Sequence, residues 1–170
     1  MSVRTGLLLP GTLLLSALLA ACGGGDDNPA AGGELTISAA TPAANNTKID
    51  LSTATAKGNS TRAADGFSAT AYCEVFWENA TGANGKKYAL QVYFRQSDKA
   101  PLNVSVIEVA SGWVVVNNNS GAALTGLTVD TAAKTIAFNN KAMTGSAGEL
   151  GTLSGTVSFP ANATTAACGS

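Results

Sequence analysis

The stretch FSATAYCEVFWENATGANGKKYALQVYFR, residues 67–95, decides the fold class. Along residues 67–77 the odd-numbered positions, which include Cys73, Val75 and Trp77, share one face, and the even-numbered positions share the other. Residues 87–95 alternate in the same way. A period of two residues indicates β-strands, and Asn84-Gly85 between the two runs is a strong signal for a tight turn. The stretch therefore predicts an antiparallel β-hairpin.

The expected register of this hairpin follows from its turn. If Asn84 and Gly85 form a two-residue turn, Val75 lies opposite Phe94 and Trp77 lies opposite Val92. Both pairs bring apolar side chains together on one face, so the turn and the hydrophobic pattern agree. We expect this face, with Cys73, to point into the core.

A second hairpin is predicted in LTVDTAAKTIAF, residues 127–138. A four-residue loop at 131–134 places Val129 opposite Ile136 and brings Leu127 against Phe138. The apolar faces of the two strands match here as well.

Weaker strand patterns occur at residues 35–38, 48–55, 102–109, 113–117 and 153–159, and Pro160 closes the last of them. From Glu34 onward, no segment has a convincing helical period. We therefore expect one all-β domain over residues 34–170. The predicted architecture is an antiparallel β-sandwich of eight or nine short strands, with a small β-barrel as the alternative.

The residue inventory excludes several classes of site. The chain contains 170 residues and no histidine, which rules out Ser-His-Asp and Cys-His nucleophiles and His-ligated metal centres. Charged residues make up 12% without a basic cluster, so a nucleic-acid surface is not expected. Glu74 and Glu78 share a strand face but lie roughly 13 Å apart, beyond the spacing of glycosidase carboxylates. A second catalytic carboxylate would have to come from another strand, for example Glu108. We expect a protein that is not an enzyme and has no cofactor or metal.

The N-terminal segment is typical of an export signal. Arg4 precedes an apolar run at residues 7–21, which is too short for a transmembrane helix and is interrupted by Pro10 and Gly11. The run ends in LAAC, residues 19–22, which resembles the lipobox of bacterial lipoprotein precursors. The resemblance implies that residues 1–21 are removed and that Cys22 receives diacylglycerol and an acyl chain such as palmitate. The alternative is an ordinary secretory leader with an unmodified Cys22.

Residues 22–33 are rich in glycine and small polar residues, which predicts a flexible tether. Asp26, Asp27 and Asn28 lie in it without the glycine and glutamate spacing of a calcium loop. In lipoproteins of enteric-type Gram-negative bacteria, aspartate directly after the lipidated cysteine retains the protein at the inner membrane. Gly23 stands there in this sequence, so the resemblance implies a lipid anchor in the outer membrane.

The sequence contains three cysteines. If lipid consumes Cys22, Cys73 and Cys168 remain as an even pair in the oxidising periplasm. We therefore predict a disulfide between Cys73 and Cys168.

Two classes of function fit these expectations. The first is a lipid-anchored envelope protein that binds or scaffolds an envelope protein or a glycan. The second is a carbohydrate- or peptide-binding module, or less readily a hydrolase, that uses the outward face of the strands at 67–78 and 87–95. Its candidate ligand residues are Tyr72, Glu74, Phe76 and Tyr93. Solvent exposure of this face would favour the second class, and a covering sheet would favour the first.

Overall fold

A computed structural model describes residues 32–118, 124–160 and Cys168. This part of the chain forms ten strands and two short 3₁₀ helices, with no α-helix and no helix long and apolar enough to cross a membrane. In chain order the elements are β1 (Gly33–Thr41), η1 (Ala43–Asn45), β2 (Thr47–Asp50), η2 (Leu51–Thr53), β3 (Thr55–Arg62), β4 (Tyr72–Gly82), β5 (Lys87–Arg95), β6 (Pro101–Glu108), β7 (Val114–Asn118), β8 (Leu127–Asp130), β9 (Thr135–Thr144) and β10 (Leu150–Ser158). The all-β prediction is confirmed. Cys22, the predicted leader and most of the predicted tether lie outside the described residues.

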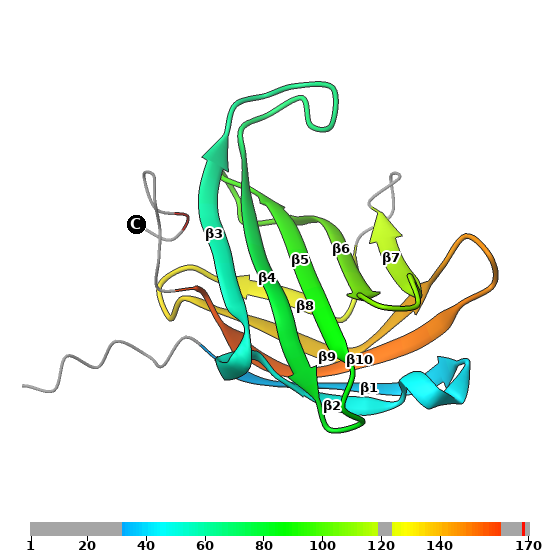
Figure 1. The fold of residues 1–170 in the computed structure, drawn as a ribbon. Helices are drawn as coiled ribbons and strands as arrows, with labels where there is room; N and C mark the ends of the chain where they lie inside the picture. The colour runs from blue at the N-terminus through cyan, green and yellow to red at the C-terminus, as the bar shows by residue number, and fades with distance from the viewer. Residues whose placement is uncertain (1–31, 119–123, 161–167, 169–170) are drawn as a thin grey trace, which may run out of the picture.

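The strands close into an antiparallel barrel. Hydrogen-bonded neighbours run in the order β10-β1-β2-β4-β5-β6-β7-β9, and β9 pairs with β10, so these eight strands complete a ring (Figure 1). β3 pairs with β4 and β8 pairs with β9 outside this ring. The prediction of a sandwich was therefore wrong, because the strands close into one ring. The barrel, which was the alternative, is the observed architecture.

The ring is joined weakly at two corners. β2 meets β4 only at Ile49↔Gly82 and Asp50↔Thr81, and β7 meets β9 at Val116↔Thr144. Between these corners the wall formed by β3 to β7 lies across a second wall formed by β1, β2, β8, β9 and β10 (Figure 1). The inward faces of both walls supply the core, as they would in a sandwich.

Side chains fill the inside of the barrel. On β4, Cys73, Val75 and Trp77 are at most 1% exposed, as the alternation predicts. The facing wall contributes fully buried side chains that include Leu35, Ile37, Ile49, Ile136, Met143, Leu153 and Val157. A barrel of about eight strands has an interior just wide enough for such packing.

The first hairpin forms with a shifted register. Val75 pairs with Val92 and Trp77 pairs with Leu90, two residues away from the predicted partners. The Gly82 N–H donates to the Lys86 carbonyl at 2.9 Å, so the loop has three residues and ends at Gly85 with φ +78°.

A β-bulge between Trp77 and Ala80 adds a second shift of one residue, with Asn79 at φ 58°. One shift alone would turn the inward side chains outward. The two together restore the match of the apolar faces, which explains why the hydrophobic pattern did not reveal the error.

The second hairpin matches its prediction. Val129 pairs with Ile136 and Leu127 pairs with Phe138. Asp130 Oδ1 accepts hydrogen bonds from the backbone N–H groups of Ala132 and Ala133, each at 2.9 Å, and thereby fixes the loop.

Other predicted boundaries need correction. The strand expected at 67–77 begins only at Tyr72, and Phe67 is 50% exposed instead of inward. The strand expected at 48–55 is interrupted by η2, where Asp50 Oδ1 accepts from the Ser52 N–H at 2.9 Å. β3 was not predicted because its sequence, TAKGNSTR, lacks an apolar face. The remaining weak patterns correspond to β1, β6, β7 and β10.

Cys73 and Cys168 form the predicted disulfide, with their Cα atoms 5.7 Å apart. Cys168 is 2% exposed, and its sulfur lies 3.1 Å from the Ser60 carbonyl oxygen of β3. The bond therefore fastens the C-terminal segment to β4 beside β3.

Candidate functional site

Three aromatic rings meet on the outer wall of the barrel, and we call Phe67, Tyr72 and Tyr93 the aromatic cluster. Their ring centroids lie 4.9 to 5.9 Å apart with tilted planes. Tyr72 begins β4, Tyr93 lies on β5, and Phe67 comes from the β3–β4 loop. Phe67 is 50% exposed, whereas Tyr72 beneath it is 6% exposed. The cluster thus presents one exposed ring on a supported base.

Asp65 holds Phe67 in this position. Its Oδ1 accepts hydrogen bonds from the N–H groups of Phe67 at 2.8 Å and Ser68 at 3.2 Å, an Asx turn. Its Oδ2 accepts from the Tyr72 hydroxyl at 2.8 Å. One carboxylate therefore ties the loop backbone to the aromatic cluster.

Glu74 lies next to the cluster on the same outward face of β4. Its Oε1 accepts from Gln91 at 2.8 Å and from the Tyr93 hydroxyl at 3.3 Å, and its Oε2 accepts from Arg62 Nε at 2.9 Å. The pairing of β3 with β4 brings Arg62 to this position. The carboxylate is thus held between a cation and two neutral donors.

These contacts set the protonation of the site. Burial, and next the Glu74 carboxylate, raise the pKa of Tyr93 to about 12. Burial and the hydrogen bond to Asp65 raise the pKa of Tyr72. The Phe67 N–H and the Tyr72 hydroxyl lower the pKa of Asp65. At neutral pH the two phenols are therefore uncharged donors beside an ionised Asp65.

The structure brings together three of the four predicted ligand residues, namely Tyr72, Glu74 and Tyr93. Phe76 shares their wall but lies farther along β4, opposite Gln91, and is half-buried. The sequence analysis placed Phe67 in the core and so missed its part in the cluster. Asp65-Gly66 directly before it is a turn signal that could have marked it as a loop residue.

The other aromatic and acidic candidates do not join this site. Trp77 and Trp113 are 1% and 5% exposed and belong to the core. Glu108 is 2% exposed and lies inside the barrel, whereas Glu74 points outward, so the structure does not pair these two carboxylates. Among the described residues, no group of three or more acidic or cysteine side chains is placed to hold a metal ion.

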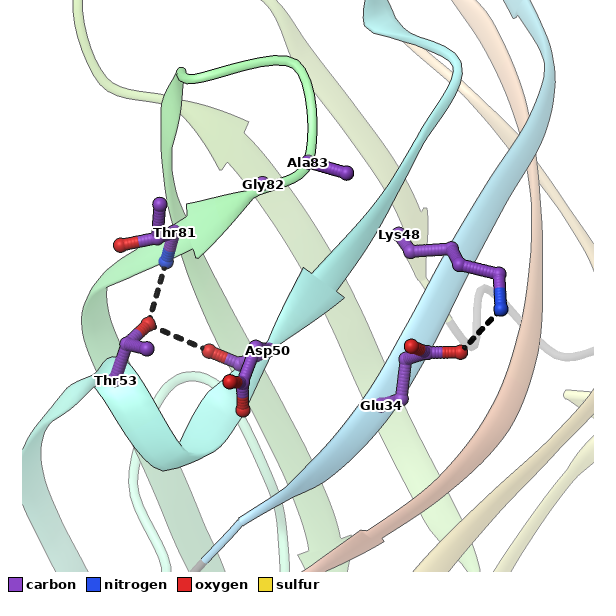
Figure 2. A pocket seen from close by; sticks show the side chains of 7 residues that line it. All are labelled: Glu34, Lys48, Asp50, Thr53, Thr81, Gly82 and Ala83. Carbon is purple, nitrogen blue, oxygen red and sulfur yellow. Dashed lines mark hydrogen bonds and ion pairs between the residues drawn. The ribbon is translucent and has the colours of Figure 1, made fainter.

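A surface pocket of about 270 Å³ lies where β2, η2 and β4 meet, lined by Glu34, Lys48, Asp50, Thr53, Thr81, Gly82 and Ala83 (Figure 2). Lys48 and Glu34 form an ion pair at 2.8 Å with both side chains more than half exposed. Thr53 Oγ1 accepts from the Thr81 N–H and donates to the Asp50 carbonyl, each at 2.7 Å. The polar groups of the pocket bond one another, as those beside the aromatic cluster do, but no aromatic ring lines the pocket, so it is a weaker candidate for a ligand site than the cluster.

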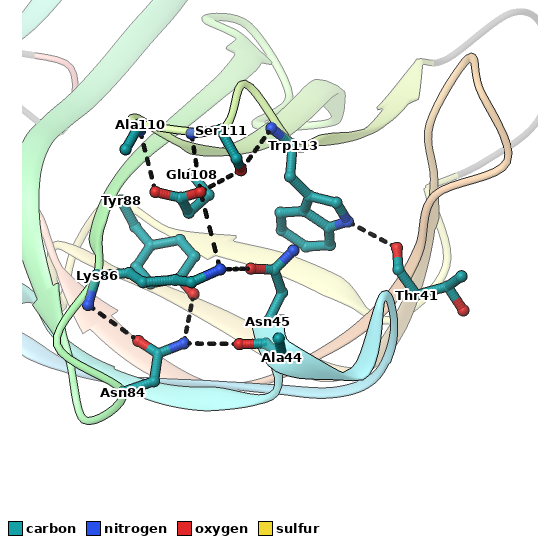
Figure 3. A network of polar contacts seen from close by, with 10 residues as sticks. All are labelled: Thr41, Ala44, Asn45, Asn84, Lys86, Tyr88, Glu108, Ala110, Ser111 and Trp113. Atoms are coloured by element: carbon teal, nitrogen blue, oxygen red, sulfur yellow. Dashed lines mark hydrogen bonds and ion pairs between the residues drawn. The ribbon is translucent and has the colours of Figure 1, made fainter.

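A polar network, buried at Asn45 and Glu108 and open to solvent at Asn84, lies at one end of the barrel (Figure 3). Lys86 Nζ donates to Asn45 Oδ1 at 2.8 Å and lies 3.9 Å from Glu108 Oε2. Asn84 Nδ2 donates to the Tyr88 hydroxyl at 2.8 Å. These contacts join the β1–β2 connection, the β4–β5 loop and the end of β6.

Searches with the whole chain against protein-family models, curated proteins and solved structures found no match.

Proposed function

We propose that this protein is a lipid-anchored protein of the bacterial cell envelope, held in the outer membrane through Cys22, and that its barrel binds or scaffolds rather than catalyses. The observation that carries the proposal is the Cys73–Cys168 bond. It uses two of the three cysteines in the sequence and leaves Cys22, at the end of the LAAC motif, for lipid. A structural disulfide also fits an exported protein.

The number of residues between Cys22 and the barrel suits such an anchor. β1 begins at Gly33, and the residues between are mostly glycine, alanine and small polar residues. About eleven residues reach at most roughly 40 Å when extended. The barrel would therefore stay close to the bilayer surface.

The anchor is tested by Cys22→Ser, which should abolish labelling with radioactive palmitate and leave an unprocessed precursor. Cys168→Ser is the control, because it removes a thiol of the disulfide and should leave the labelling intact. Normal cleavage and release of the Cys22→Ser protein would contradict the lipid anchor.

A specific observation favours carbohydrate as the ligand of the barrel. The exposed ring of Phe67 rests on Tyr72 and Tyr93, with the carboxylates of Asp65 and Glu74 beside it. An aromatic ring offers an apolar face to the C–H groups of a sugar, and phenols and carboxylates bond its hydroxyls. Because packed side chains occupy the inward positions, we place this binding on the outer wall.

The geometry favours a sugar over an extended peptide. Peptides that add to a sheet pair their backbone with an exposed strand edge. The aromatic cluster lies on the face of β4 and β5, and both strands are paired along their two edges, β4 with β3 and β5, and β5 with β4 and β6. A glycan that stacks on Phe67 needs no free edge.

Calorimetric titration of the folded protein with soluble peptidoglycan glycan strands tests this candidate. Phe67→Ala should weaken binding at least tenfold with little change in unfolding temperature, because half of the ring is already exposed. Leu150→Ala, which truncates another exposed apolar side chain at 46% exposure, is the matched control and should bind normally. Equal binding by both variants, or binding of stem peptides without glycan, would contradict a carbohydrate site at Phe67.

A further inference from the structure

The polar network of Figure 3 places an amine, a carboxamide and a carboxylate in one small space. Asn45 ends η1, Lys86 lies in the β4–β5 loop, and Glu108 ends β6. The Lys86 amine donates to Asn45 Oδ1 at 2.8 Å and lies 3.9 Å from Glu108 Oε2. Folding thus brings together two side chains that are 41 positions apart in the sequence.

The amide and the carboxylate lie in aromatic, buried surroundings, whereas the Lys86 side chain is 34% exposed and enters from the loop. Asn45 is 1% exposed and Glu108 is 2% exposed, with Tyr88 at 1% and Trp113 at 5% against them (Figure 3). An amine fixed beside an amide reacts at a very high effective concentration, and the burial of Asn45 limits the access of water to its carbonyl carbon.

We propose that Lys86 and Asn45 join in an intramolecular isopeptide bond. The Lys86 ammonium loses one proton, its nitrogen attacks Asn45 Cγ to form a C–N bond, and that nitrogen then gives up a second proton. The bond from Cγ to Nδ2 then breaks, and Nδ2 leaves with two added protons as an ammonium ion. Atoms and charge balance within the chain and its ammonium product, and no oxidant or other reactant is required.

Glu108 is placed to act as the base. The Ser111 hydroxyl donates to its carboxylate, and the backbone N–H groups of Ala110 and Ser111 donate to it at 3.0 Å each. The Ser111 hydroxyl first, then these N–H groups and the Lys86 amine, lower the pKa of Glu108 against the opposing effect of burial. It is therefore ionised when the barrel folds and can accept the Lys86 proton and pass it to the departing nitrogen.

The hydrogen bond holds the Lys86 amine against Asn45 Oδ1, which is the geometry before the attack on Cγ. Rotation of the Asn45 amide about its last torsion turns the face of Cγ toward the Lys86 nitrogen, and such terminal torsions have broad minima. The product would tie the β1–β2 connection to the β4–β5 hairpin. The disulfide lies at the other end of β4, so the barrel would carry a covalent link near each end of that strand.

Peptide mapping of the purified full chain tests the bond. After denaturation, reduction and digestion with trypsin and a glutamate-specific protease, segment 35–48 should appear joined to segment 79–87. The mass of the joined product should be below the sum of the two segments by one ammonia. Separate, unmodified segments 35–48 and 79–86 would overturn the proposal, because free Lys86 is a trypsin site.

Variants distinguish the formation of this bond from other reactions that release ammonia. Lys86→Arg and Asn45→Ala should each abolish the linked segment, and Glu108→Gln should slow its appearance after refolding at least tenfold. Lys87→Arg is the matched control, because Lys87 is exposed and bonds Thr81 instead, and it should keep the link. An ammonia loss that persists in Lys86→Arg would place the chemistry at Asn84-Gly85 and overturn the proposal.

Discussion

Tyr72, Tyr88 and Tyr93 are the three tyrosines of the chain, and each has its hydroxyl bonded within the fold. Tyr72 donates to Asp65 at 2.8 Å, and Tyr88 accepts from Asn84 at 2.8 Å. The Tyr93 hydroxyl lies 3.3 Å from a Glu74 oxygen. These hydrogen bonds thus fix the position of each tyrosine side chain, since the hydroxyl of a buried phenol needs a hydrogen-bond partner.

The three tyrosines should make the protein less stable at alkaline pH. Burial raises the pKa of all three tyrosines above the ordinary value, that of Tyr93 to about 12. Unfolded tyrosines lose their protons near pH 10, so above that pH the unfolded state binds fewer protons and the free energy of unfolding falls as pH rises.

Phenolate absorbance against pH measures this effect. We expect the folded protein to titrate later than the protein in urea, and Tyr93→Phe to remove the latest of the three transitions. A full phenolate signal at pH 10 with an unchanged β-sheet circular dichroism spectrum would contradict the burial of these hydroxyls.

At the scale of elements, the β4–β5 hairpin depends on a bulge that brings the apolar faces into register. Asn79 adopts φ 58° between Trp77 and Ala80, in the left-handed region that asparagine and glycine tolerate. The three-residue loop and this bulge each shift the pairing by one position. With this three-residue loop, the hairpin therefore places Trp77 in the core only if the bulge forms as well.

Substitution of Asn79 tests the role of the bulge. Asn79→Val should lower the free energy of unfolding by about 1–2 kcal/mol, because a β-branched residue is strained at this φ. Asn79→Gly should stay within about 0.5 kcal/mol of the parent, since glycine adopts it freely. Urea unfolding measures both, with Asn117→Val in β7 as the control at an ordinary strand position. Equal stability of the two Asn79 variants would show that the left-handed position is not needed.

At the scale of the whole molecule, the barrel is closed by two weak corners and fastened by one disulfide. β2–β4 and β7–β9 contribute few backbone pairs, so packing of the two walls holds the corners together. The Cys73–Cys168 bond joins positions 95 residues apart, and Cys168 is packed against β3. The bond therefore spans most of the described chain.

Removal of the disulfide should cost much of the stability of the barrel. On the chain-entropy model, Cys73→Ala and Cys168→Ala should each lower the free energy of unfolding by about 4–5 kcal/mol, and the double variant should lose little more. Urea unfolding of the three variants measures this. Alkylation of the parent under denaturing, non-reducing conditions should leave both thiols unlabelled, and labelling at Cys73 and Cys168 would contradict the bond.

The sequence by itself determined the features that depend on local pattern. Period-two alternation predicted that Cys73, Val75 and Trp77 point inward, because each strand must bury one face. The second hairpin was predicted correctly because the hydrogen bonds of Asp130 that fix its loop join residues within four positions of one another. Cysteine arithmetic predicted the bond between Cys73 and Cys168 from the export signal.

Only the tertiary structure decided the closure of the barrel and the make-up of the candidate site. A strand buries the same face in a sandwich and in a barrel, so the alternation of apolar and polar residues does not reveal that β9 pairs with β10. Phe67 has an apolar side chain in an alternating run, and the hydrogen bonds of Asp65 to the loop and to Tyr72 override that pattern. Arg62 reaches Glu74 because a polar strand, β3, pairs with β4. Several folds are compatible with the same local pattern. Contacts between distant segments select one of them, because these contacts contribute free energy only when the chain is packed.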